Sequence, residues 1–354
     1  MSIFEHMKRN KSRELLFFEE EALSLKAIVA IDSIVLGPAN ASAKFFRYNN
    51  EDDAIADALD IAYYNSLRAA LLKRSIGGGS IILMSNSENI KSEMYFRALG
   101  VFLNRWKGKV FMTKSKGVSY KDMNYVRKET DYVLGMEESH KGLGRIYVSR
   151  AKGMIQGLKA AAKYKLGNES LKGLKITVQG IGDLGMELVK ELIKEEAVLT
   201  ITDKIYDRIK VVQDQVSNVK IARPHEIYDV KSDIFCSCAA EKLISSDDVE
   251  KMNCKILSGG TNEILSHKKA VETFKKKGMM YIPGYIINGG DIIQLSNEMQ
   301  GYGKDKMEKE LKDIYYNTMD IISESDSTGV PPCDVATKKA EKYVKDISAI
   351  KMFK

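Results

Sequence analysis

A glycine-rich turn, GIGDLG at 180–185, lies in the second half of the chain. An apolar run over 175–179 precedes it and predicts a buried strand, and apolar residues at three- to four-residue spacing follow it and predict a helix. Gly180 allows a tight turn, Gly182 lets backbone N–H groups approach an anion, and Gly185 allows close packing of helix on strand. The positive end of the helix then faces the anion. This pattern predicts a turn that holds the pyrophosphate of a dinucleotide. The residues expected to contact it are Gly180, Gly182, Asp183, Leu184 and Gly185.

An acidic residue, Asp203, ends the next apolar run over 198–203. A carboxylate at this point of a β-α-β unit accepts hydrogen bonds from the adenosine ribose and repels a 2′-phosphate, so NAD is expected and NADP is disfavoured. Residues 171–205 are therefore interpreted as the first β-α-β unit of a Rossmann domain. The alternative is a structural glycine turn in a Rossmann fold without a cofactor.

Short apolar runs alternate with amphipathic stretches along the chain, which predicts an α/β fold. A loop rich in glycine and charge over 135–145 marks a domain boundary. We expect an N-terminal α/β domain over 1–135, a Rossmann domain with a doubly wound parallel sheet over 136–330, and a cleft between them. Helices at about 331–354 are expected to pack back on the first domain. The predicted strands are 25–32, 77–84, 109–113, 175–179, 198–203, 233–238, 255–260 and 279–284, and the predicted helices are 51–72, 92–106, 148–166, 184–196, 306–326 and 334–350.

Bulk composition limits the class of protein. The 354 residues are 44% hydrophobic and 29% charged, with a formal net charge of +7. No apolar run reaches the roughly 18 residues of a membrane span, and the charged N-terminus lacks a signal-peptide core, so a cytoplasmic protein is expected. Lysines and glutamates are interleaved, which indicates solvated helix faces rather than a nucleic-acid-binding surface.

The four cysteines indicate free thiols rather than disulfides in a chain of this length. Cys236 and Cys238 are close in sequence, but no second cysteine pair or histidine cluster accompanies them. The ligand spacing of structural zinc sites is therefore missing, and no metal site is expected.

A series of further motifs occurs in a fixed order along nearly the whole chain. Taken together they resemble the Glu/Leu/Phe/Val dehydrogenase family, and within it the leucine dehydrogenases most. The resemblance implies an N-terminal substrate domain, a C-terminal NAD-binding domain, a catalytic cleft, a homo-oligomer and reversible NAD-dependent oxidative deamination of an amino acid. The motifs are LKAIVAID (25–32), LGPA (36–39), FRALG (96–100), ETDYVLG (129–135), GLKAAAK (157–163), VQGIG (178–182), TD (202–203) and PGYIINGGDI (283–292).

The resemblance also implies three catalytic groups, and all three are replaced here. In the family, one lysine holds the substrate carboxylate, a second activates water, and an aspartate moves a proton to and from the amine. The carboxylate-binding lysine aligns with Arg68, which is still able to grip a carboxylate. The second lysine follows a triple glycine in the family, but Ser80 follows it here. The aspartate aligns with Ser115, and a serine supplies no base at neutral pH.

The positions that the resemblance assigns to the substrate side chain are polar here, whereas the family pockets are apolar. An aliphatic substrate would leave those buried polar groups unpaired, which is costly. The family threonine that holds the nicotinamide carboxamide aligns with Arg150, while Asn262 and Asn288 are retained. The expected pocket residues are Asn40, Arg68, Thr113, Asn288, Asp291 and Gln294, and Ala41 and Ser42 replace two family glycines.

Three functions remain open at this point. The first is a catalytically inactive, NAD(H)-binding homologue with a regulatory or binding role. The second is an NAD-dependent oxidoreductase with altered chemistry, such as reduction of a preformed imine or oxo compound with a polar side chain, because the cofactor itself supplies the hydride. The third is an active amino-acid dehydrogenase, which would need substitutes for two essential groups.

Overall fold

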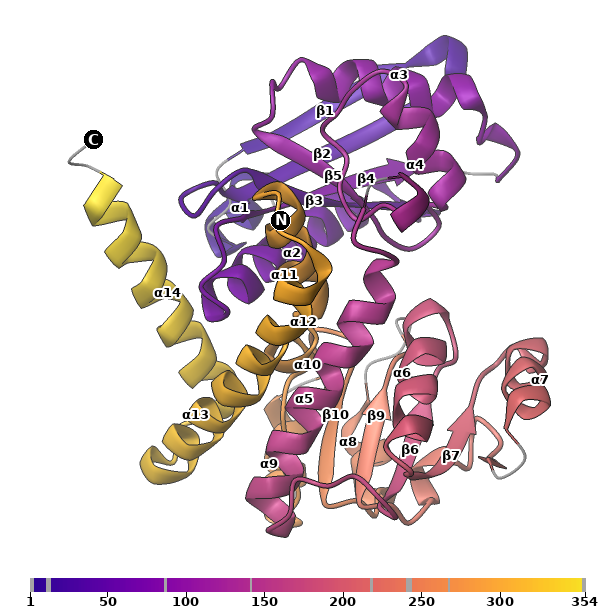
Figure 1. Cartoon of the computed structure of the whole chain (residues 1–354), viewed down its shortest axis with the longest axis vertical. Helices are drawn as coiled ribbons and strands as arrows, with labels where there is room; N and C mark the ends of the chain where they lie inside the picture. The colour runs from indigo at the N-terminus through magenta and orange to yellow at the C-terminus, as the bar shows by residue number, and fades with distance from the viewer. Residues whose placement is uncertain are drawn as a thin grey trace. The chain divides into compact units, whose positions relative to one another are not determined.

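The computed structural model describes residues 3–10, 14–85, 88–140, 142–216, 219–239, 244–266 and 268–351. The chain divides into two compact units, each with its own β-sheet (Figure 1). Unit 1 comprises Met1–Ile146, Ile292–Met307 and Lys339–Lys354. Unit 2 comprises Tyr147–Asp291 and Glu308–Lys338.

The sheet of unit 1 has five strands, which are β1 (Glu14–Glu20), β2 (Leu25–Ser33), β3 (Ala39–Phe46), β4 (Gly77–Met84) and β5 (Val110–Lys114). Their order across the sheet is β1-β2-β4-β3-β5. β2 pairs antiparallel with both β1 and β4, whereas β3 runs parallel to β4 and β5. The mixed sheet therefore places β3 between two parallel neighbours, where both of its edges are hydrogen-bonded.

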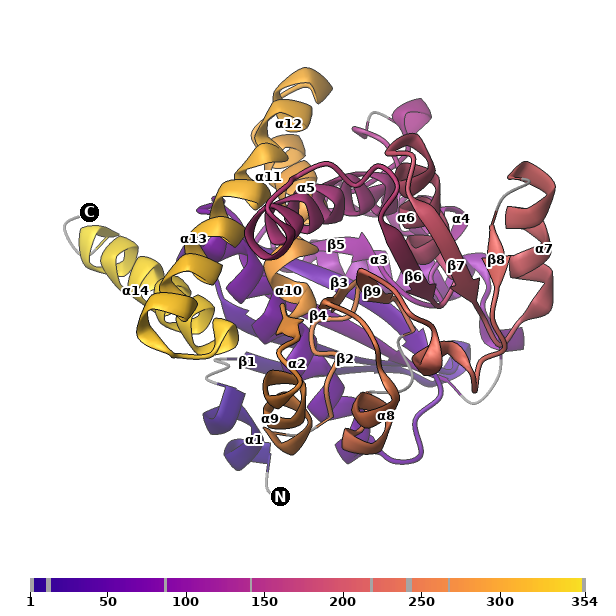
Figure 2. The same cartoon turned by 90° about the horizontal axis from the view of Figure 1, so that it is seen from below.

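Helices cover both faces of this sheet, and they are α1 (Ile3–Asn10), α2 (Glu51–Leu71), α3 (Glu93–Asn104) and α4 (Tyr120–Arg127). α2 packs on one face through a core that includes Ile28, Ala58 and Ile82, and α3 and α4 pack on the other (Figure 2). α2 begins after Asn50, whose side chain accepts a hydrogen bond from the N–H of Asp53 and caps the helix.

The sheet of unit 2 has six strands, which are β6 (Lys175–Gln179), β7 (Val198–Thr202), β8 (Lys220–Ile221), β9 (Ile234–Ser237), β10 (Ile256–Gly259) and β11 (Met280–Tyr281). All neighbours are parallel, in the order β11-β10-β9-β6-β7-β8. This is the strand order of a Rossmann fold, with the reversal between β6 and β9. The predicted fold class, a two-domain α/β chain with a Rossmann-type parallel sheet, is confirmed.

The helices that alternate with these strands are α6 (Asp183–Lys194), α7 (Tyr206–Gln215), α8 (Ser246–Lys251) and α9 (Lys268–Lys276). The remaining helices are α5 (Ile146–Leu166), α10 (Gly284–Ile287), α11 (Gly290–Met299), α12 (Lys304–Glu310), α13 (Lys312–Thr328) and α14 (Pro332–Lys351). The single helix predicted over 306–326 is divided at Leu311, where the N–H of Ile314 bonds to Leu311 O, three residues back instead of four. The last residues of the predicted C-terminal segment, 352–354, lie outside the described residues.

Two strands of unit 1, β1 and β3, have no counterpart among the predicted elements. β3 reads ANASAKFF, which is poor in the β-branched residues that favour strands. Ala39, Ala41 and Ala43 are nonetheless completely buried on the α3 side of the sheet. Small side chains are accepted there because pairing with two neighbours and burial outweigh intrinsic propensity.

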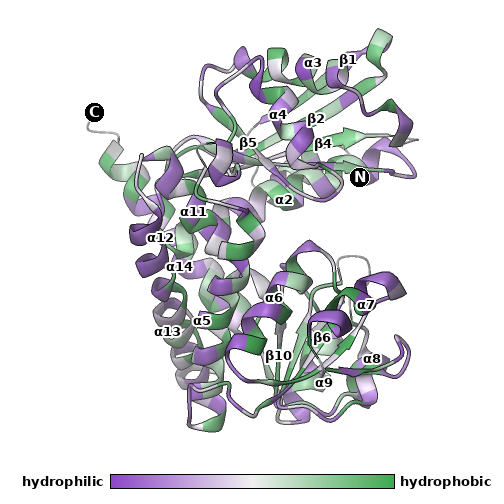
Figure 3. Cartoon of the chain, turned by 45° about the vertical axis from the view of Figure 1, so that its right-hand side comes forward, coloured by the Kyte–Doolittle hydropathy of each residue, from purple (hydrophilic) through white to green (hydrophobic). Residues whose placement is uncertain are grey.

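Hydrophobic residues are concentrated on the strands, whereas hydrophobic and hydrophilic residues alternate along the helices (Figure 3). Within the described part of the chain, every helix is too short or too polar to cross a bilayer.

The triple glycine at the start of β4 sets how closely α2 approaches the sheet. A Cβ added at Gly78 would lie 2.2 Å from Ser66 Oγ and 2.4 Å from Ala62 O, both on α2. Real Cβ atoms do not approach this closely, so Gly78→Ala forces α2 away from β4. We expect a loss of about 1–3 kcal/mol in the free energy of unfolding, measured by thermal or urea melts.

Gly303→Ala is the matched control, since a Cβ there meets nothing within 4 Å and the residue also belongs to unit 1. Equal melting temperatures for the two variants would contradict the close approach of α2 at Gly78.

Candidate functional site

The turn at 180–185 joins β6 to α6, as the sequence predicts. Gly180 has a φ of +93°, and a Cβ there would lie 2.8 Å from the backbone N of Ala239. A Cβ at Gly185 would lie 1.9 Å from Gly180 O. Both positions therefore exclude a side chain, the first because of the turn and the second because α6 begins directly against it.

Gly182 differs from the other two glycines because the space beside it is open. Its φ of −74° suits any residue, and a Cβ there would meet only Arg208 Nη1, at 4.0 Å. It immediately precedes the exposed Asp183, the first residue of α6, so the space lies at the positive end of a helix. Leu184, the next predicted residue of the turn, points towards Gly260: its Cδ2 lies 2.4 Å from where a Cβ on Gly260 would be. The space beside Gly182 is therefore open at the start of α6, where the sequence predicts a pyrophosphate.

Asp203 follows β7 and is bonded to the turn. Its carboxylate accepts hydrogen bonds from the N–H groups of Ile181, at 2.6 Å, and Ile205, at 2.8 Å. Arg208 Nη1 lies 3.5 Å from the same carboxylate, whose side chain is only 6% exposed. These two backbone N–H groups and the Arg208 guanidinium therefore compensate much of the negative charge of Asp203.

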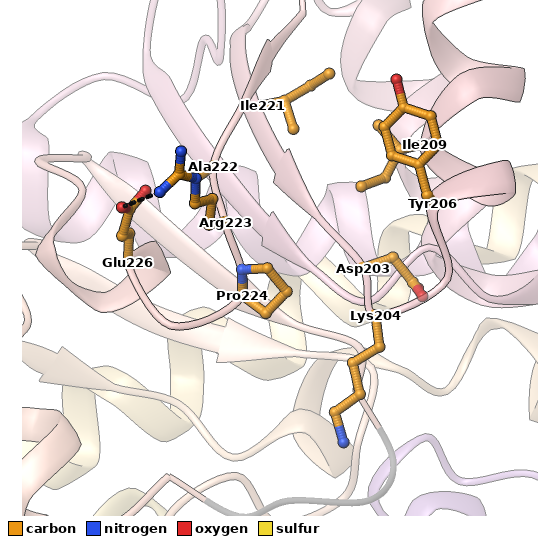
Figure 4. A pocket seen from close by; sticks show the side chains of 9 residues that line it. All are labelled: Asp203, Lys204, Tyr206, Ile209, Ile221, Ala222, Arg223, Pro224 and Glu226. Carbon is orange, nitrogen blue, oxygen red and sulfur yellow. Dashed lines mark ion pairs between the residues drawn. The ribbon is translucent and has the colours of Figure 1, made fainter.

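A pocket of about 650 Å³ opens beside Asp203 (Figure 4). It lies where β7 and β8 end, which is where a Rossmann fold binds the adenosine half of a dinucleotide. Of the residues that line it, the sequence predicted only Asp203. The others carry no motif, although Lys204 and Tyr206 closely follow the predicted strand over 198–203. The lining residues other than Asp203 are Lys204, Tyr206, Ile209, Ile221, Ala222, Arg223, Pro224 and Glu226.

Four further predicted residues gather around the carbonyl of Gly260. Arg150 Nη2 donates to Gly260 O at 2.9 Å, and its Nη1 lies 4.0 Å from Asp291 Oδ2. The completely buried Asn288 donates to the same Gly260 O at 2.9 Å and to Asn262 Oδ1 at 3.2 Å. Unit 2 thus joins Arg150, Asn262, Asn288 and Asp291 in one polar network.

Cys238 lies beside this network, with Sγ 3.2 Å from where a Cβ on Gly260 would be. Burial raises the pKa of this thiol to about 11, against the lowering effects of a Gly260 backbone hydrogen bond and the Arg150 charge. The thiol is therefore protonated at neutral pH and is not an activated nucleophile. No cluster of three His, Cys, Asp or Glu residues suited to a metal occurs in the described ranges.

In unit 1, the amide of Asn65 connects α2 to two strands. Its Nδ2 donates to Gly79 O at 2.8 Å, to Ser42 Oγ at 3.0 Å and to Asn40 O at 3.3 Å. Its Oδ1 accepts a hydrogen bond from Arg68 Nη2 at 2.5 Å, and Arg68 is only 4% exposed. Asn65 was not predicted as a site residue, although its i, i+3 spacing to Arg68 on a helix would have placed both side chains on one face.

Thr113 and Asn40 extend this group of polar side chains. Thr113 Oγ1 donates to Asn40 Oδ1 at 2.8 Å, and both residues are almost completely buried. Asn40 Nδ2 is buried and has no hydrogen-bond partner among the described residues. A buried amide donor of this kind marks a place for an acceptor from a ligand or water. We call Asn40, Ser42, Asn65, Arg68 and Thr113 the polar cluster.

The two serines at the expected catalytic positions have different surroundings. Ser80 is completely buried, and its hydroxyl donates to Ala58 O of α2 at 2.6 Å. Ser115 follows β5 and is half-buried, and its carbonyl accepts a hydrogen bond from the N–H of Val118. Ser80 is therefore committed to packing between β4 and α2.

Gln294, expected in the substrate pocket, is bonded to the loop that ends near residue 144. Its Nε2 donates to Gly144 O at 2.7 Å and to Glu298 Oε1 at 2.9 Å. Glu298 also accepts hydrogen bonds from the N–H groups of Gly135 and Leu143. Burial raises the pKa of the Glu298 carboxyl, although each of these hydrogen bonds acts to lower it.

The space beside Gly182 can be tested separately from folding. Gly182→Ala places a methyl group where the backbone geometry allows it and no protein atom is close, so the melting temperature should stay near that of the unchanged protein. The methyl would occupy the phosphate space, and we expect NADH binding at least about tenfold weaker in a fluorescence titration. Unchanged affinity in a well-folded Gly182→Ala protein would contradict a phosphate position at this turn.

Comparison with known proteins identifies relatives of this chain. Residues 196–346 match the sequence model described as Glutamate/Leucine/Phenylalanine/Valine dehydrogenase. The leucine dehydrogenase of Thermoactinomyces intermedius is 31% identical over 97% of this chain and 94% of its own length.

Solved structures extend the likeness to the fold. The crystal structure of L-tryptophan dehydrogenase from Nostoc punctiforme matches with a TM-score of 0.79 and 27% identity, over 98% of this chain and 99% of that one. A hetero-hexameric glutamate dehydrogenase from Thermus thermophilus shares the fold alone, with a TM-score of 0.80 at 13% identity over 98% of this chain and 95% of its own. On its sequence similarity along nearly the whole length, the chain belongs to the glutamate/leucine/phenylalanine/valine dehydrogenase family of amino-acid dehydrogenases.

Proposed function

We propose that the chain is an NAD(H)-binding homologue of leucine dehydrogenase that does not carry out oxidative deamination and has a binding or regulatory role. The observation that carries this proposal is Ser80, at the position of the family's water-activating lysine. Its hydroxyl is completely buried and bonded to Ala58 O. A group in this state neither accepts a proton from water nor contacts a substrate.

Unit 2 has the features that an NAD(H) site requires. Gly182 and the start of α6 would hold the pyrophosphate, and the pocket beside Asp203 would hold the adenosine. The network around Gly260, with Asn262, Asn288 and Arg150, would face the nicotinamide half. Bound NAD(H) accepts or donates a hydride, and the residues of the chain bind and orient it.

Unit 1 retains a place for an anion but offers no base at the replaced positions. The Arg68 guanidinium is always protonated, so it suits a carboxylate and is unable to act as a general base. Ser115 supplies neither the charge nor the proton-transfer capacity of a carboxylate. A substrate bound at the polar cluster would therefore meet no group at these positions that activates water.

The test combines binding with turnover. Purified protein titrated with NADH should show saturable binding by nicotinamide fluorescence. The same preparation should give no absorbance change with NAD and leucine, or with NADH, ammonia and 2-oxo acids. Leucine oxidation at a rate comparable to a leucine dehydrogenase assayed in parallel would contradict the proposal.

The double variant Ser80→Lys with Ser115→Asp separates two causes of inactivity. We expect it to remain inactive, because Arg150 and the polar cluster still differ from the family's apolar pocket. Its melting temperature provides the control, since a lysine at a completely buried position can also unfold unit 1. A folded double variant that oxidises leucine would show that the two serines alone account for the loss.

A second candidate is an NAD-dependent oxidoreductase that reduces a preformed imine or oxo compound with a polar side chain. The unpaired amide of Asn40 favours it, because a buried donor needs an acceptor and an aliphatic side chain has none. Here the cofactor's hydride would add to carbon and a side chain such as Asp291, Lys114, Lys116 or Tyr120 would supply the proton. NADH consumption with cyclic imines or polar 2-oxo acids, in the assay above, would favour this function over an inactive homologue.

We also propose that the chain acts in the cytoplasm as a homo-oligomer. The cysteines are all free, which suits a reducing compartment, and a structural neighbour is hexameric. Light scattering of purified protein that gives the mass of a single chain would contradict the oligomer.

A further inference from the structure

We propose that the pocket beside Asp203 also accepts a phosphate on the ribose 2′ position, so that the chain binds NADP(H) as well as NAD(H). This inference rests on the proposed function, because it concerns the same dinucleotide site. It differs from the expectation that an acidic residue after the second strand excludes a 2′-phosphate.

The exclusion depends on a free carboxylate, and the carboxylate of Asp203 is not free. Oδ2 accepts from the N–H of Ile181 at 2.6 Å, and Oδ1 accepts from the N–H of Ile205 at 2.8 Å. Arg208 Nη1 adds a positive charge 3.5 Å from Oδ2. Repulsion of a second anion falls when an opposite charge lies this close, because the positive charge opposes the field of the carboxylate.

Lys204 is the residue that supplies a positive charge for the phosphate. It directly follows Asp203, is exposed and lines the pocket, and it forms no ion pair with another described residue. In Figure 4 its side chain leaves the backbone in a different direction from that of Asp203. Because Lys204 is exposed and lines the pocket, its ammonium group is accessible to an anion at the edge of the pocket.

The remaining charges around the pocket occur in pairs. Arg223 lies 3.7 Å from Glu226 and Arg208 lies 3.5 Å from Asp203, which leaves Lys204 as the uncompensated charge among these five residues. Arg208 is also 46% exposed, so N–H groups of its guanidinium other than the one facing Asp203 remain accessible to a phosphate. A cation of this kind close to the acidic residue is how Rossmann folds accommodate a 2′-phosphate.

The first experiment compares ligands that differ only in the 2′-phosphate. Titration with NADH and NADPH, and calorimetry with 5′-AMP and adenosine 2′,5′-bisphosphate, should give dissociation constants within about tenfold of each other in each pair. If the protein binds NADH but binds NADPH more than about a hundredfold more weakly, the inference is overturned and the proposed function stays intact. Binding of neither dinucleotide would overturn both.

The second experiment uses Lys204→Ala with Lys210→Ala as its matched control. Lys210 is also exposed and lies on α7, but it does not line the pocket. Loss of one charged contact should weaken NADPH binding by about fivefold to tenfold in Lys204→Ala, and by a larger factor than it weakens NADH binding. Equal effects of the two variants on NADPH would indicate general charge attraction and overturn the specific role of Lys204.

Salt provides a third readout that does not depend on a variant. Raising the ionic strength screens exposed charges, so NADPH binding should weaken more steeply than NADH binding. Parallel slopes for the two dinucleotides would contradict a phosphate contact with Lys204.

Discussion

Both units depend on a helix that approaches a strand or turn more closely than any side chain allows. In unit 1, α2 lies against β4 at Gly78, where Ser66 and Ala62 occupy the place of a Cβ. In unit 2, the first turn of α6 lies against Gly180 O at Gly185. Protein interiors are close-packed, so these contacts set how near each helix lies to its strand or turn. The polar groups of α2 and the N-terminus of α6 reach their strands only because of this approach.

The close approach of α2 also explains how the polar residues at the replaced positions of unit 1 form hydrogen bonds with each other and with the backbone. Asn65 reaches three acceptors on β3 and β4 and holds Arg68 through its own oxygen. Ser80, on the same face, is satisfied by a carbonyl of α2. Buried polar groups are costly unless they are paired, and here most of them are paired within the unit. The replaced positions therefore form a coherent polar interior, in which Asn40 Nδ2 has no acceptor among the described residues.

In unit 2, the effect of Asp203 on a nearby phosphate depends on the hydrogen bonds and charges around its carboxylate. A free aspartate after the second strand repels a phosphate, whereas Asp203 is bonded to two backbone N–H groups and lies beside Arg208. The electrostatics of the pocket are therefore set by Lys204, Arg223 and Glu226 together with Asp203, and by which of them are paired. In the proposed binding of NADP(H), this arrangement and not the acidic residue alone would set the dinucleotide preference.

The sequence by itself determined the Rossmann unit, its glycine turn, the family and most of the elements, because these depend on local periodicity and on backbone conformations that few residues adopt. Only the tertiary structure decided that ANASAKFF is a strand, since pairing on both edges outweighs its weak propensity. It also decided that Asn65 forms hydrogen bonds with the expected site residues and that Gln294 donates a hydrogen bond to Gly144 O. The compensation of the Asp203 charge by backbone N–H groups and Arg208 is likewise visible only in the structure. Each of these depends on contacts between residues far apart in sequence, which no local pattern records.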